Sequence, residues 1–438
     1  MSIGLITILL FGCLFTLLLL GLQVSFALLI TGIIFTLVLW GPSHLFVLAS
    51  SMQGALSTEV YIAIPLFILM GNILAHTGIA DELFHALYLW TGRLKGGLAM
   101  GTVAAGTILA AMCGSSEAGT LTVGLMALPA MLKRGYDARI AIGSIAAGGL
   151  LGFLIPPSVI AIVYAGISGV SMGKLYFASF LPGILLATLY ILYIGIRSAL
   201  EPGICPSIPK EEAPTWEERF QALAKVVLPL LIIFVVLGGI YGGITTPTEA
   251  AGVGAVTAFI VAILKRKITW KAVNDALRAT FQLLGMIGWI IMCVTVFSNV
   301  YNALGAPDIV NSLISYFPAG GFGVIIFMQL SIFLLGTFMD DFALLFLTMP
   351  IYVPIIKSLG FDPIWFGVLI LINMQCALLT PPYGFNLFYM RAITPPEIKT
   401  FTIYKGVLPF IGLQLVCLIL VMIFPQIALW LPTALTGK

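Results

Sequence analysis

The sequence predicts an all-α polytopic membrane protein with two inverted repeats, about ten transmembrane helices and two re-entrant helical hairpins. The prediction rests on the composition, on the spacing of long apolar segments and on residues that recur between the two halves. Of the 438 residues, 61% are hydrophobic and 8% are charged, whereas a soluble domain carries about 25% charged residues. A water-soluble protein of this size could not cover so much apolar surface, so the lipid bilayer is its expected surrounding.

Long apolar segments locate the helices, because a span needs roughly 20 mostly apolar residues to cross about 30 Å of hydrocarbon. The apolar start of the chain has no positive n-region and continues into a second apolar segment, so it is predicted to be the first span and not a signal peptide. Ordinary spans are predicted near residues 3–20, 24–41, 60–76, 138–165, 175–197, 226–244, 248–264, 280–303, 363–390 and 406–432.

Two further apolar stretches, 97–133 and 319–356, are interrupted near the middle by small or charged residues. Each arm of the first stretch gives roughly 25 Å of helix at 1.5 Å per residue, which is short of a comfortable span. We therefore predict two helical hairpins that enter the membrane and return, the first of them from the cytoplasm. Two ordinary spans joined by an external Gly-Ser-Ser turn are the alternative for 97–133.

A polar, proline-rich stretch divides the chain into two halves. Residues 1–198 are assigned to the first repeat, 199–225 to a cytoplasmic linker and 226–438 to the second repeat. Each half contains five spans, one of which is a broken helix, and one hairpin. The hairpin and the broken helix are 97–133 and 138–165 in the first repeat, and 319–356 and 363–390 in the second.

The two halves share residues at a nearly constant offset, which is the signature of an internal repeat. Asn72, Gly78 and Asp81 recur 227 positions later, and six residues recur 225 positions later. Because each half has an odd number of crossings, the second copy enters the membrane upside down. Inverted repeats with broken helices are the architecture of secondary carriers, whose binding site lies near the membrane midplane. The six residues are Pro129, Gly135, Asp137, Pro156, Pro157 and Tyr164, with partners Pro354, Gly360, Asp362, Pro381, Pro382 and Tyr389.

The distribution of lysine and arginine predicts the orientation. Threading the spans places 17 of the 20 basic residues on one side, and only Lys174, Lys357 and Lys438 on the other. The richer side is cytoplasmic by the positive-inside rule, so both termini are predicted to lie outside.

Two breaks in hydrophobicity lie in the first repeat. The segment Cys113–Ala118, with Ser115, Ser116 and Glu117, interrupts the first hairpin. The segment Ile155–Ser158, with Pro156 and Pro157, interrupts a span. Two prolines remove two backbone donors and leave upstream carbonyls without partners. In hydrocarbon these carbonyls need a partner, which is either a bound cation or, in a plain proline kink, Ser158 or a water.

The counterpart breaks in the second repeat are richer in oxygen ligands. Asp340 and Asp341 are adjacent carboxylates in the second hairpin, with no lysine or arginine at matching depth. Carboxylates at membrane depth are costly and usually face a cavity or pair with a charge, so a cation or a proton is the expected partner. A helix cap is the alternative for one of them. Around Pro381 and Pro382, Thr380 and Asn386 add oxygens and Gly384 permits close backbone approach, a set that suits sodium better than a transition metal.

A further motif, Thr245–Ala250, fits the start of an N-capped helix. Pro247 would stand in its first turn, and Glu249 would be favoured by the helix dipole.

Other classes of function find no support in the sequence. The net charge of +3 and the lack of a basic run with interleaved aromatics argue against a nucleic-acid partner. The six cysteines form neither a CxxC nor a His-containing metal spacing. There is no nucleotide-binding GxxxxGK[ST] motif, and no HExxH or nucleophile–base pair that would indicate an enzyme. A channel would need a ring of like residues, so the paired breaks favour a carrier over a channel or a structural subunit.

Together, these motifs resemble the large membrane subunit of tripartite ATP-independent periplasmic (TRAP) transporters, over essentially the whole chain. The resemblance implies a sodium-coupled elevator carrier of the ion-transporter superfamily in the bacterial inner membrane. Its transport domain, built from the two hairpins and the two broken helices, would slide against a scaffold. A stand-alone organic-anion carrier of the same superfamily is the alternative. The motifs are Gly114–Ala118, Pro156–Ser158, Thr246–Ala250, Met339–Asp341 and Thr380–Gly384.

The resemblance also implies partners and sites. The partners are a separate small membrane subunit of four helices and a periplasmic binding protein that delivers a small organic acid, such as a C4-dicarboxylate or sialic acid. Glu117, Met339 and Asn386 are candidates for the substrate cavity. Gln23 stands where a relative is expected to carry proline. The implied ligands of the coupling ion, Na⁺, are Ser115, Ser116, Pro156, Ser158, Asp340, Asp341, Thr380 and Gly384.

Overall fold

The chain folds almost entirely into α-helices, because a bilayer offers backbone groups no partners except one another. The computed structural model describes residues 3–114, 116–201, 203–208, 214–306 and 320–436, and none of these residues forms a β-strand. The helices of the first half are α1 (Ile3–Leu19), α2 (Val24–Trp40), α3 (Leu45–Leu56), α4 (Ala63–His76), α5 (Ile79–Thr91), α6 (Gly97–Cys113), α7 (Ser116–Lys133), α8 (Ala138–Leu150), α9 (Val159–Ser168) and α10 (Met172–Leu200).

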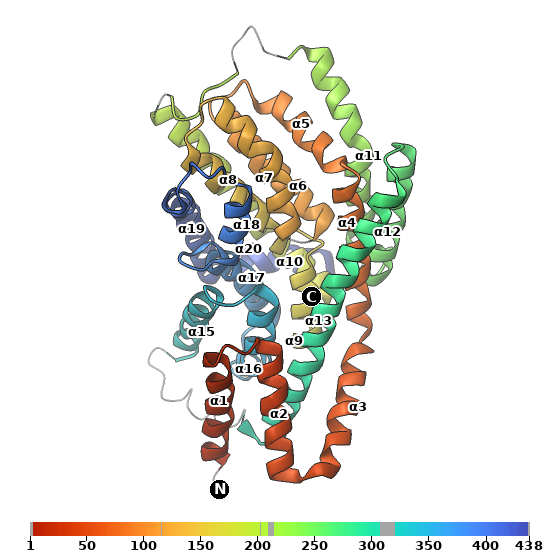
Figure 1. Ribbon diagram of the computed structural model, residues 1–438, viewed down its shortest axis with the longest axis vertical. Helices are drawn as coiled ribbons and strands as arrows, with labels where there is room; N and C mark the ends of the chain where they lie inside the picture. The colour runs from red at the N-terminus through yellow and green to blue at the C-terminus, as the bar shows by residue number, and fades with distance from the viewer. Residues whose placement is uncertain (1–2, 115, 202, 209–213, 307–319, 437–438) are drawn as a thin grey trace.

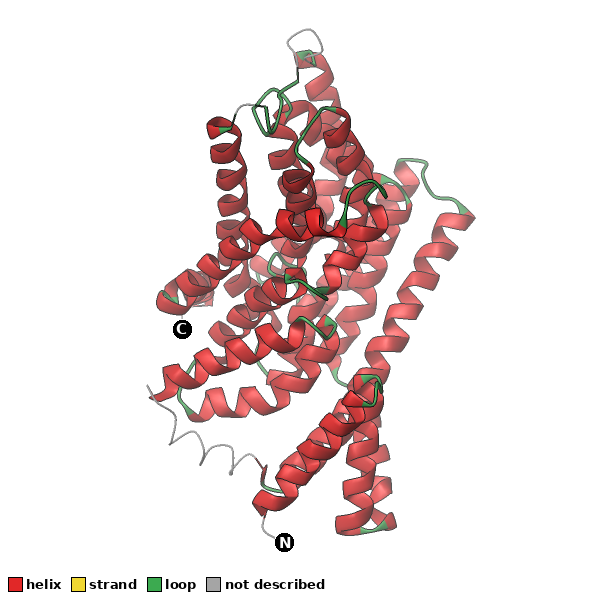
Figure 2. Cartoon of the chain, turned by 60° about the vertical axis from the view of Figure 1, so that its left-hand side comes forward, coloured by secondary structure: helices red, strands yellow, loops and turns green. Residues whose placement is uncertain are grey.

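The second half is also helical throughout its described residues, and it again contains a hairpin followed by a broken helix (Figures 1 and 2). Short 3₁₀ turns, η1 (Pro42–His44), η2 (Glu59–Ile62) and η3 (Leu151–Phe153), occur in the first half. The helices of the second half are α11 (Trp216–Tyr241), α12 (Pro247–Leu264), α13 (Trp270–Ala303), α15 (Gly320–Gly336), α16 (Asp341–Ser358), α17 (Pro363–Leu379), α18 (Phe385–Ile393), α19 (Thr400–Ile423) and α20 (Gln426–Thr436).

Helix length and composition agree with a membrane protein. Seven helical segments of the described chain are long and apolar enough to cross a bilayer, and nine shorter apolar helices accompany them. Among the shorter ones are α6 and α15 of the two hairpins and α8, α9 and α17 of the two broken helices. Both interrupted stretches of the sequence are thus helix–break–helix units, as predicted.

The repeat extends to backbone conformation. Gly135 and Gly360 both have φ of +76° in the turn before a broken helix. Asp137 and Asp362 then cap α8 and α17, and each carboxylate accepts the N–H two residues on at 2.7 Å. In Figure 1 the hairpin α6–α7 lies in the upper half, whereas α15 and α16 lie in the lower half, nearer the N-terminus. The two copies are therefore inverted relative to each other.

The helices pack in two groups. In the first group, α4 packs against α12 and α13, α13 also packs against α2 and α3, and α11 packs against α12 and α5. In the second group, α8 packs against α6, α7 and α19, and α17 packs against α15 and α19. The groups meet where α5 contacts the first hairpin and where α13 contacts α16. The hairpins and broken helices thus pack on one another and on α19, and α4 also joins the two groups through its contact with α6.

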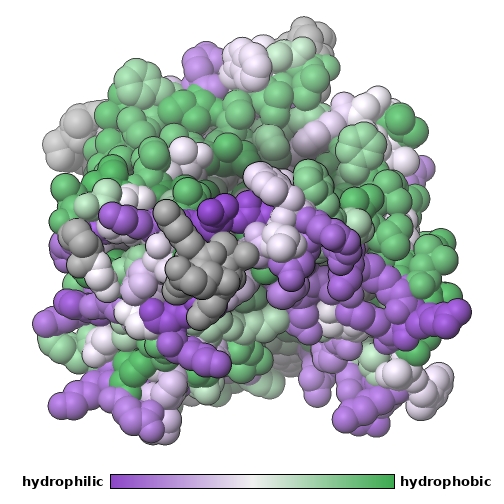
Figure 3. All heavy atoms as spheres, turned by 90° about the horizontal axis from the view of Figure 1, so that it is seen from above, coloured by the Kyte–Doolittle hydropathy of each residue, from purple (hydrophilic) through white to green (hydrophobic). Residues whose placement is uncertain are grey.

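Polar residues gather at the upper end of the molecule. The linker between α10 and α11 lies at this end in Figure 1, and Figure 3, which looks down on it, shows polar residues over one side and apolar residues over the other. Glu82 of α5 forms salt bridges here with Lys265 and with Lys267, the latter at 2.8 Å. These pairs fasten α5 to the loop between α12 and α13.

Several helix boundaries differ from the predicted spans. The span predicted at 406–432 is two helices, because Pro425 disfavours helical geometry at the preceding residue, and Phe424 has φ of −117° and ψ of 78°. Helix α11 begins at Trp216, before the predicted 226, and α13 begins at Trp270, before the predicted 280. These polar first turns extend beyond the apolar core, so hydropathy alone did not reveal them. A capping box between Thr215 and Glu218 starts α11.

Two smaller expectations concern helix starts. Thr246 caps α12 in a capping box with Glu249, and Pro247 stands in the first turn, as predicted. Gln23 precedes α2 with φ of −59° and ψ of 142°. Proline also has φ near −65°, so Gln23 keeps the backbone conformation that proline would impose.

Candidate functional site

Each broken helix is interrupted by a pair of prolines. The Pro156–Pro157 and Pro381–Pro382 peptide bonds are both cis. In the first break Ser158 is fully buried, and its hydroxyl oxygen accepts the N–H of Ala161 at 3.4 Å as the cap of α9. The Ser158 carbonyl accepts the hydroxyl of Tyr176 at 3.4 Å. Ser158 therefore caps the returning helix, and within the described residues its hydroxyl has no hydrogen bond to the carbonyls upstream of the prolines.

The tip of the first hairpin lies against this break. The carbonyl of Gly114 accepts the N–H of Val159 at 3.2 Å. Gly114 has φ of +63°, and a Cβ there would stand 3.0 Å from the Pro157 carbonyl oxygen. Glycine is required on both counts, because its lack of a side chain permits positive φ and close approach. The hairpin backbone thus joins the broken helix directly.

Three predicted residues of this tip have limited description. Ser115 lies outside the described residues, and the side chains of Ser116 and Glu117 are likewise not described. The backbone of Ser116 begins α7. Their assignment to a cation site and to the substrate cavity stays a prediction.

The second break has similar geometry and different side chains. The Thr380 hydroxyl donates to the Cys376 carbonyl at 2.7 Å, and the N–H of Gly384 donates to the Thr380 carbonyl at 3.1 Å. A Cβ at Gly384 would stand 2.6 Å from the Leu378 carbonyl oxygen. The chain therefore folds back on the end of α17 so closely that only glycine fits at this position.

The tip of the second hairpin carries two carboxylates. Asp340 caps α16 by accepting the N–H of Ala343 at 2.9 Å, and Asp341 is buried with one oxygen accepting the N–H of Phe342 at 3.1 Å. The capping role considered for one of them is thus real for Asp340. A carboxylate has two oxygens and about four acceptor sites, so a cap leaves capacity for a cation.

Contacts between aromatic rings bring this tip to the second break. The rings of Phe338 and Tyr383 lie 5.5 Å apart. A Cβ at Gly336, the last residue of α15, would stand 2.6 Å from the Cβ of Ala377 in α17. Met339 lies between these contacts and is half-buried. Each hairpin tip therefore meets the proline break of its own repeat.

Buried polar groups mark the place where the two halves meet. The Asn386 amide donates to the Ala146 carbonyl at 2.9 Å, which ties α18 to α8, and its amide oxygen is buried without a hydrogen-bond partner among the described residues. The Thr120 hydroxyl of α7 is buried and similarly unpartnered within the described chain. A Cβ at Gly149 would clash with that hydroxyl.

Thr120 was not anticipated from the sequence. The available signal was a run of small residues, Gly119 and Thr120 on one helix and Gly148 and Gly149 on another. Small residues let helix backbones approach closely in membranes. Within the described residues, no group of three or more His, Cys, Asp or Glu side chains could hold a metal ion. A cation here would depend on hydroxyl, amide and carbonyl oxygens together with Asp340 or Asp341.

A cavity of about 450 Å³ lies between the two helix groups in the lower part of the molecule. Residues of α3, α9, α13 and α16 line it, among them Thr295, Ser298, Asn302 and Lys357. The Lys357 ammonium donates to the Ser168 carbonyl at 2.7 Å. Most of the lining is apolar, and these polar side chains add a few hydrogen-bonding groups to it.

Comparison with known proteins identifies the family. Residues 11–427 match the family model described as "Tripartite ATP-independent periplasmic transporter, DctM component". The chain belongs to this family. The TRAP resemblance of the motifs is thereby confirmed.

Similar TRAP proteins come from several bacteria. The C4-dicarboxylate TRAP transporter large permease protein of Vibrio cholerae is 32% identical over 397 residues, which cover 86% of each chain. The ectoine TRAP transporter large permease protein of Halomonas elongata is 30% identical and covers 95% of this chain and 96% of its own. The sialic acid TRAP transporter large permease protein of Vibrio cholerae is 29% identical, with 89% and 90% covered.

The fold is shared with more distant transporters. The Alcanivorax borkumensis YdaH transporter superposes with a TM-score of 0.65 at 14% identity, over 93% of this chain and 98% of its own. Neisseria gonorrhoeae MtrF superposes with a TM-score of 0.62 at 14% identity, over 86% and 83%. The TRAP family fold seen here thus occurs in transporters with little sequence similarity.

Proposed function

We propose that the chain is the carrier subunit of a sodium-coupled TRAP transporter that imports a small organic acid. The main support for this proposal is that each hairpin tip contacts the proline break of its own repeat. The Gly114 carbonyl accepts the N–H of Val159 in one repeat, and the Phe338 ring lies tilted against the Tyr383 ring in the other. Discontinuous helices that face each other in inverted repeats form the binding sites of secondary carriers.

The coupling ion binds at these two places. In the first repeat the ligands are the hydroxyls of Ser115 and Ser116 with the backbone around Pro156 and Ser158. In the second they are Asp340 or Asp341 with the backbone around Thr380 and Gly384. Sodium is a hard cation that takes oxygen ligands, and a carboxylate offsets its charge. Family membership and the neutral and acidic oxygens at the breaks support this assignment.

The substrate is a small organic acid that binds near the same level. Relatives at about 30% identity are named for C4-dicarboxylates, ectoine and sialic acid. All three of these compounds carry a carboxylate, which helix N-termini at the breaks attract. Glu117, Met339 and Asn386 flank the breaks and are proposed to shape the cavity together with Thr120.

Two further proteins complete the transporter. A small membrane subunit of four helices packs on the exposed apolar helices of the α2–α4 and α11–α13 group, and a periplasmic binding protein delivers the substrate. The transport domain of hairpins and broken helices then moves against this scaffold as an elevator. The division of the helices into two packing groups supports this motion.

Delivery by a binding protein has a direct test. Proteoliposomes with the chain and its small subunit are supplied with binding protein and radiolabelled succinate, sialic acid or ectoine. We expect uptake of one substrate only when the binding protein is present. Equal uptake of the free substrate without binding protein would overturn the tripartite assignment and leave the stand-alone carrier.

The orientation follows the positive-inside rule, with the basic end in the cytoplasm of a bacterial cell, the chain in the inner membrane and both termini in the periplasm. Cysteines introduced by Lys267→Cys and Lys174→Cys test this in intact cells opened only at the outer membrane. We expect an impermeant thiol reagent to label the cysteine at 174 and not the one at 267. Labelling at 267 would contradict the orientation.

A further inference from the structure

A tyrosine hydroxyl reaches the backbone of each broken helix, in both repeats from the long helix that follows it. In the first repeat the Tyr176 hydroxyl of α10 donates to the Ser158 carbonyl at 3.4 Å. In the second repeat the Tyr404 hydroxyl of α19 donates to the Pro382 carbonyl at 3.0 Å. Helices α10 and α19 hold the same place in the order of elements, so the contact recurs between the repeats.

The two carbonyls differ in their other hydrogen bonds. The Ser158 carbonyl also accepts the N–H of Ile162 at 3.1 Å, at the start of α9. A carbonyl oxygen has two lone pairs, so this bond and the one from Tyr176 use both. The Pro382 carbonyl lies between the end of α17 and the start of α18, and Tyr404 is its one hydrogen-bond donor among the described residues. Tyr404 therefore stands in for the intrahelical bond that an unbroken helix would supply.

The residue after Pro382 is held by a different element. The Tyr383 ring lies 5.5 Å from the ring of Phe338, which stands two residues before Asp340 at the tip of the second hairpin. Tyr404 thus fixes one residue of the break to α19, and Phe338 fixes the next residue to the hairpin tip. The two contacts together set the position of the break relative to the carboxylates of the tip.

Helix α19 gives Tyr404 a firm base. It packs against α8 and α17 and also contacts α18. Near the other end of α17, the indole N–H of Trp365 donates to the Val421 carbonyl of α19 at 2.9 Å. Hydrogen bonds therefore tie α19 to the second broken helix both near its start and at its break, and the half-buried Tyr404 makes the one at the break.

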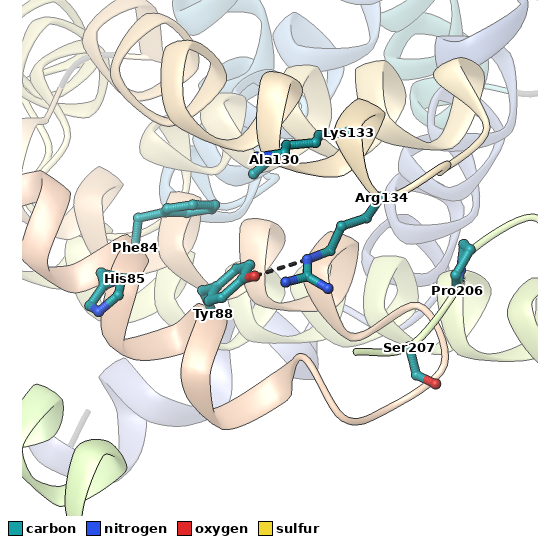
Figure 4. A pocket seen from close by; sticks show the side chains of 8 residues that line it. All are labelled: Phe84, His85, Tyr88, Ala130, Lys133, Arg134, Pro206 and Ser207. Carbon is teal, nitrogen blue, oxygen red and sulfur yellow. Dashed lines mark hydrogen bonds between the residues drawn. The ribbon is translucent and has the colours of Figure 1, made fainter. Parts of the chain in front are cut away.

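Other tyrosine hydroxyls join helices away from the two breaks. The Tyr164 hydroxyl of α9 donates to the Pro363 carbonyl, at the start of α17, at 2.5 Å. The Tyr88 hydroxyl accepts the Nε–H of Arg134 at 2.9 Å, in a cavity of about 680 Å³ at the upper end of the molecule (Figure 4). Tyr164 makes the same kind of bond as Tyr404, from a hydroxyl to a backbone carbonyl, so it provides a matched control.

We infer that Tyr404 is a positioning residue of the second cation site. Its hydroxyl holds the Pro382 peptide, so that the backbone between Thr380 and Gly384 keeps the geometry in which it binds sodium. The second lone pair of the Pro382 carbonyl remains for a cation. Tyr176 is the weaker counterpart, because the carbonyl that it contacts also has an N–H donor. This inference rests on the proposed sodium sites and adds to them a residue outside the hairpins and the broken helices.

The test is a sodium titration of the thermal unfolding midpoint of the full-length chain in nanodiscs, with choline replacing sodium so that ionic strength stays constant. Four proteins are compared: wild type, Tyr404→Phe, Tyr176→Phe and the control Tyr164→Phe. Each variant loses one hydroxyl and keeps the ring. The midpoint without sodium measures the structural cost, and the rise of the midpoint with sodium measures the apparent affinity of the sites. A merely structural role would change the first quantity and not the second.

We expect all three variants to unfold at a lower temperature than the wild type without sodium, because each has lost a hydrogen bond. The apparent affinity for sodium should fall about fivefold in Tyr404→Phe and about twofold in Tyr176→Phe, and it should not change in Tyr164→Phe. A sodium-responsive wild type with equal affinities in Tyr404→Phe and Tyr164→Phe would overturn the inference and leave the proposed function intact. A wild type that does not respond to sodium would overturn both.

Discussion

The two hairpin–break pairs share a backbone and differ in charge. In the first pair, Gly114 bonds through its backbone to Val159, and the described groups around it are neutral. In the second pair, Asp340 and Asp341 stand at the tip, and aromatic rings supply the contact. Both breaks contain a cis diproline. The two breaks thus resemble each other in backbone and differ in the charge at the tip, so the two proposed cation sites should respond differently to mutation.

Loss of a carboxylate should have the largest effect. Asp340→Asn and Asp341→Asn keep side-chain size, and asparagine caps a helix about as well as aspartate, so Asp340→Asn should fold normally. At the liganding position the change should raise the sodium concentration for half-maximal uptake about tenfold, which corresponds to about 1.4 kcal/mol. Sodium titrations of uptake by purified variants measure this.

The matched control is Asp362→Asn, which alters an exposed capping aspartate of the same repeat away from the break. Its sodium dependence should equal that of the wild type. An unchanged sodium dependence in both Asp340→Asn and Asp341→Asn would remove the second hairpin from the cation site.

Gly114→Ala should disturb the first pair through the backbone. The new Cβ would combine positive φ with a 3.0 Å approach to the Pro157 carbonyl oxygen, and positive φ alone costs about 1–2 kcal/mol. Gly135→Ala is the control, because Gly135 has φ of +76° and a Cβ there would meet no other atom. Its loss of stability therefore measures the cost of positive φ without a steric contact. We expect Gly114→Ala to lower the unfolding midpoint more than Gly135→Ala and also to weaken sodium dependence. Equal effects on both measures would show that the tip and the break are not coupled.

Gly384→Ala provides the corresponding test in the second pair. Gly384 has φ of −32°, so left-handed strain is absent, and the loss comes only from the 2.6 Å contact with the Leu378 carbonyl oxygen. We expect a lower unfolding midpoint, whereas Gly412→Ala, at an open position within α19, should stabilise by up to about 1 kcal/mol. Thermal unfolding compares the two. A midpoint for Gly384→Ala at or above the wild-type value would contradict the tight return of the chain.

Ser158→Ala should have the smallest effect of the series. Removing a helix cap costs about 1 kcal/mol, and backbone carbonyls remain to bind the ion, so sodium dependence should weaken only about twofold to fivefold. Ser171 caps α10 at the same distance of 3.4 Å outside the break. Ser171→Ala should therefore lose similar stability and leave sodium dependence unchanged. If the two variants behave alike in uptake, Ser158 is a cap only.

Much of the fold could be predicted because hydropathy marks the part of each helix that lies in hydrocarbon. It does not mark amphipathic ends, so the first turns of α11 and α13 were missed, although Thr215 and Glu218 show the spacing of a capping box. Pro425 is a sequence signal for the end of α19. The residues on both sides of it are apolar, however, so the hydropathy pattern predicted one span where the structure has α19 and α20.

The candidate site could be predicted only in outline. Rare polar residues and prolines at matched depth indicated the four breaks, because such residues are costly in a bilayer. The pairing of each hairpin tip with a break depends on tertiary contacts such as the hydrogen bond between Gly114 and Val159. Some of these contacts join residues far apart in the sequence, as the Asn386 amide and the Ala146 carbonyl are, 240 positions apart. A single sequence carries no information on these distances. Thr120 was missed because a threonine in an apolar helix is common and usually bonds its own backbone.

The central claim is that sodium drives the movement of substrate. Its most direct test is uptake into proteoliposomes that hold the complete transporter, under an inward sodium gradient alone or an inward proton gradient alone with sodium absent. We predict substrate accumulation with the sodium gradient and none with the proton gradient. Equal accumulation with protons and no sodium would contradict the sodium sites at both hairpin tips.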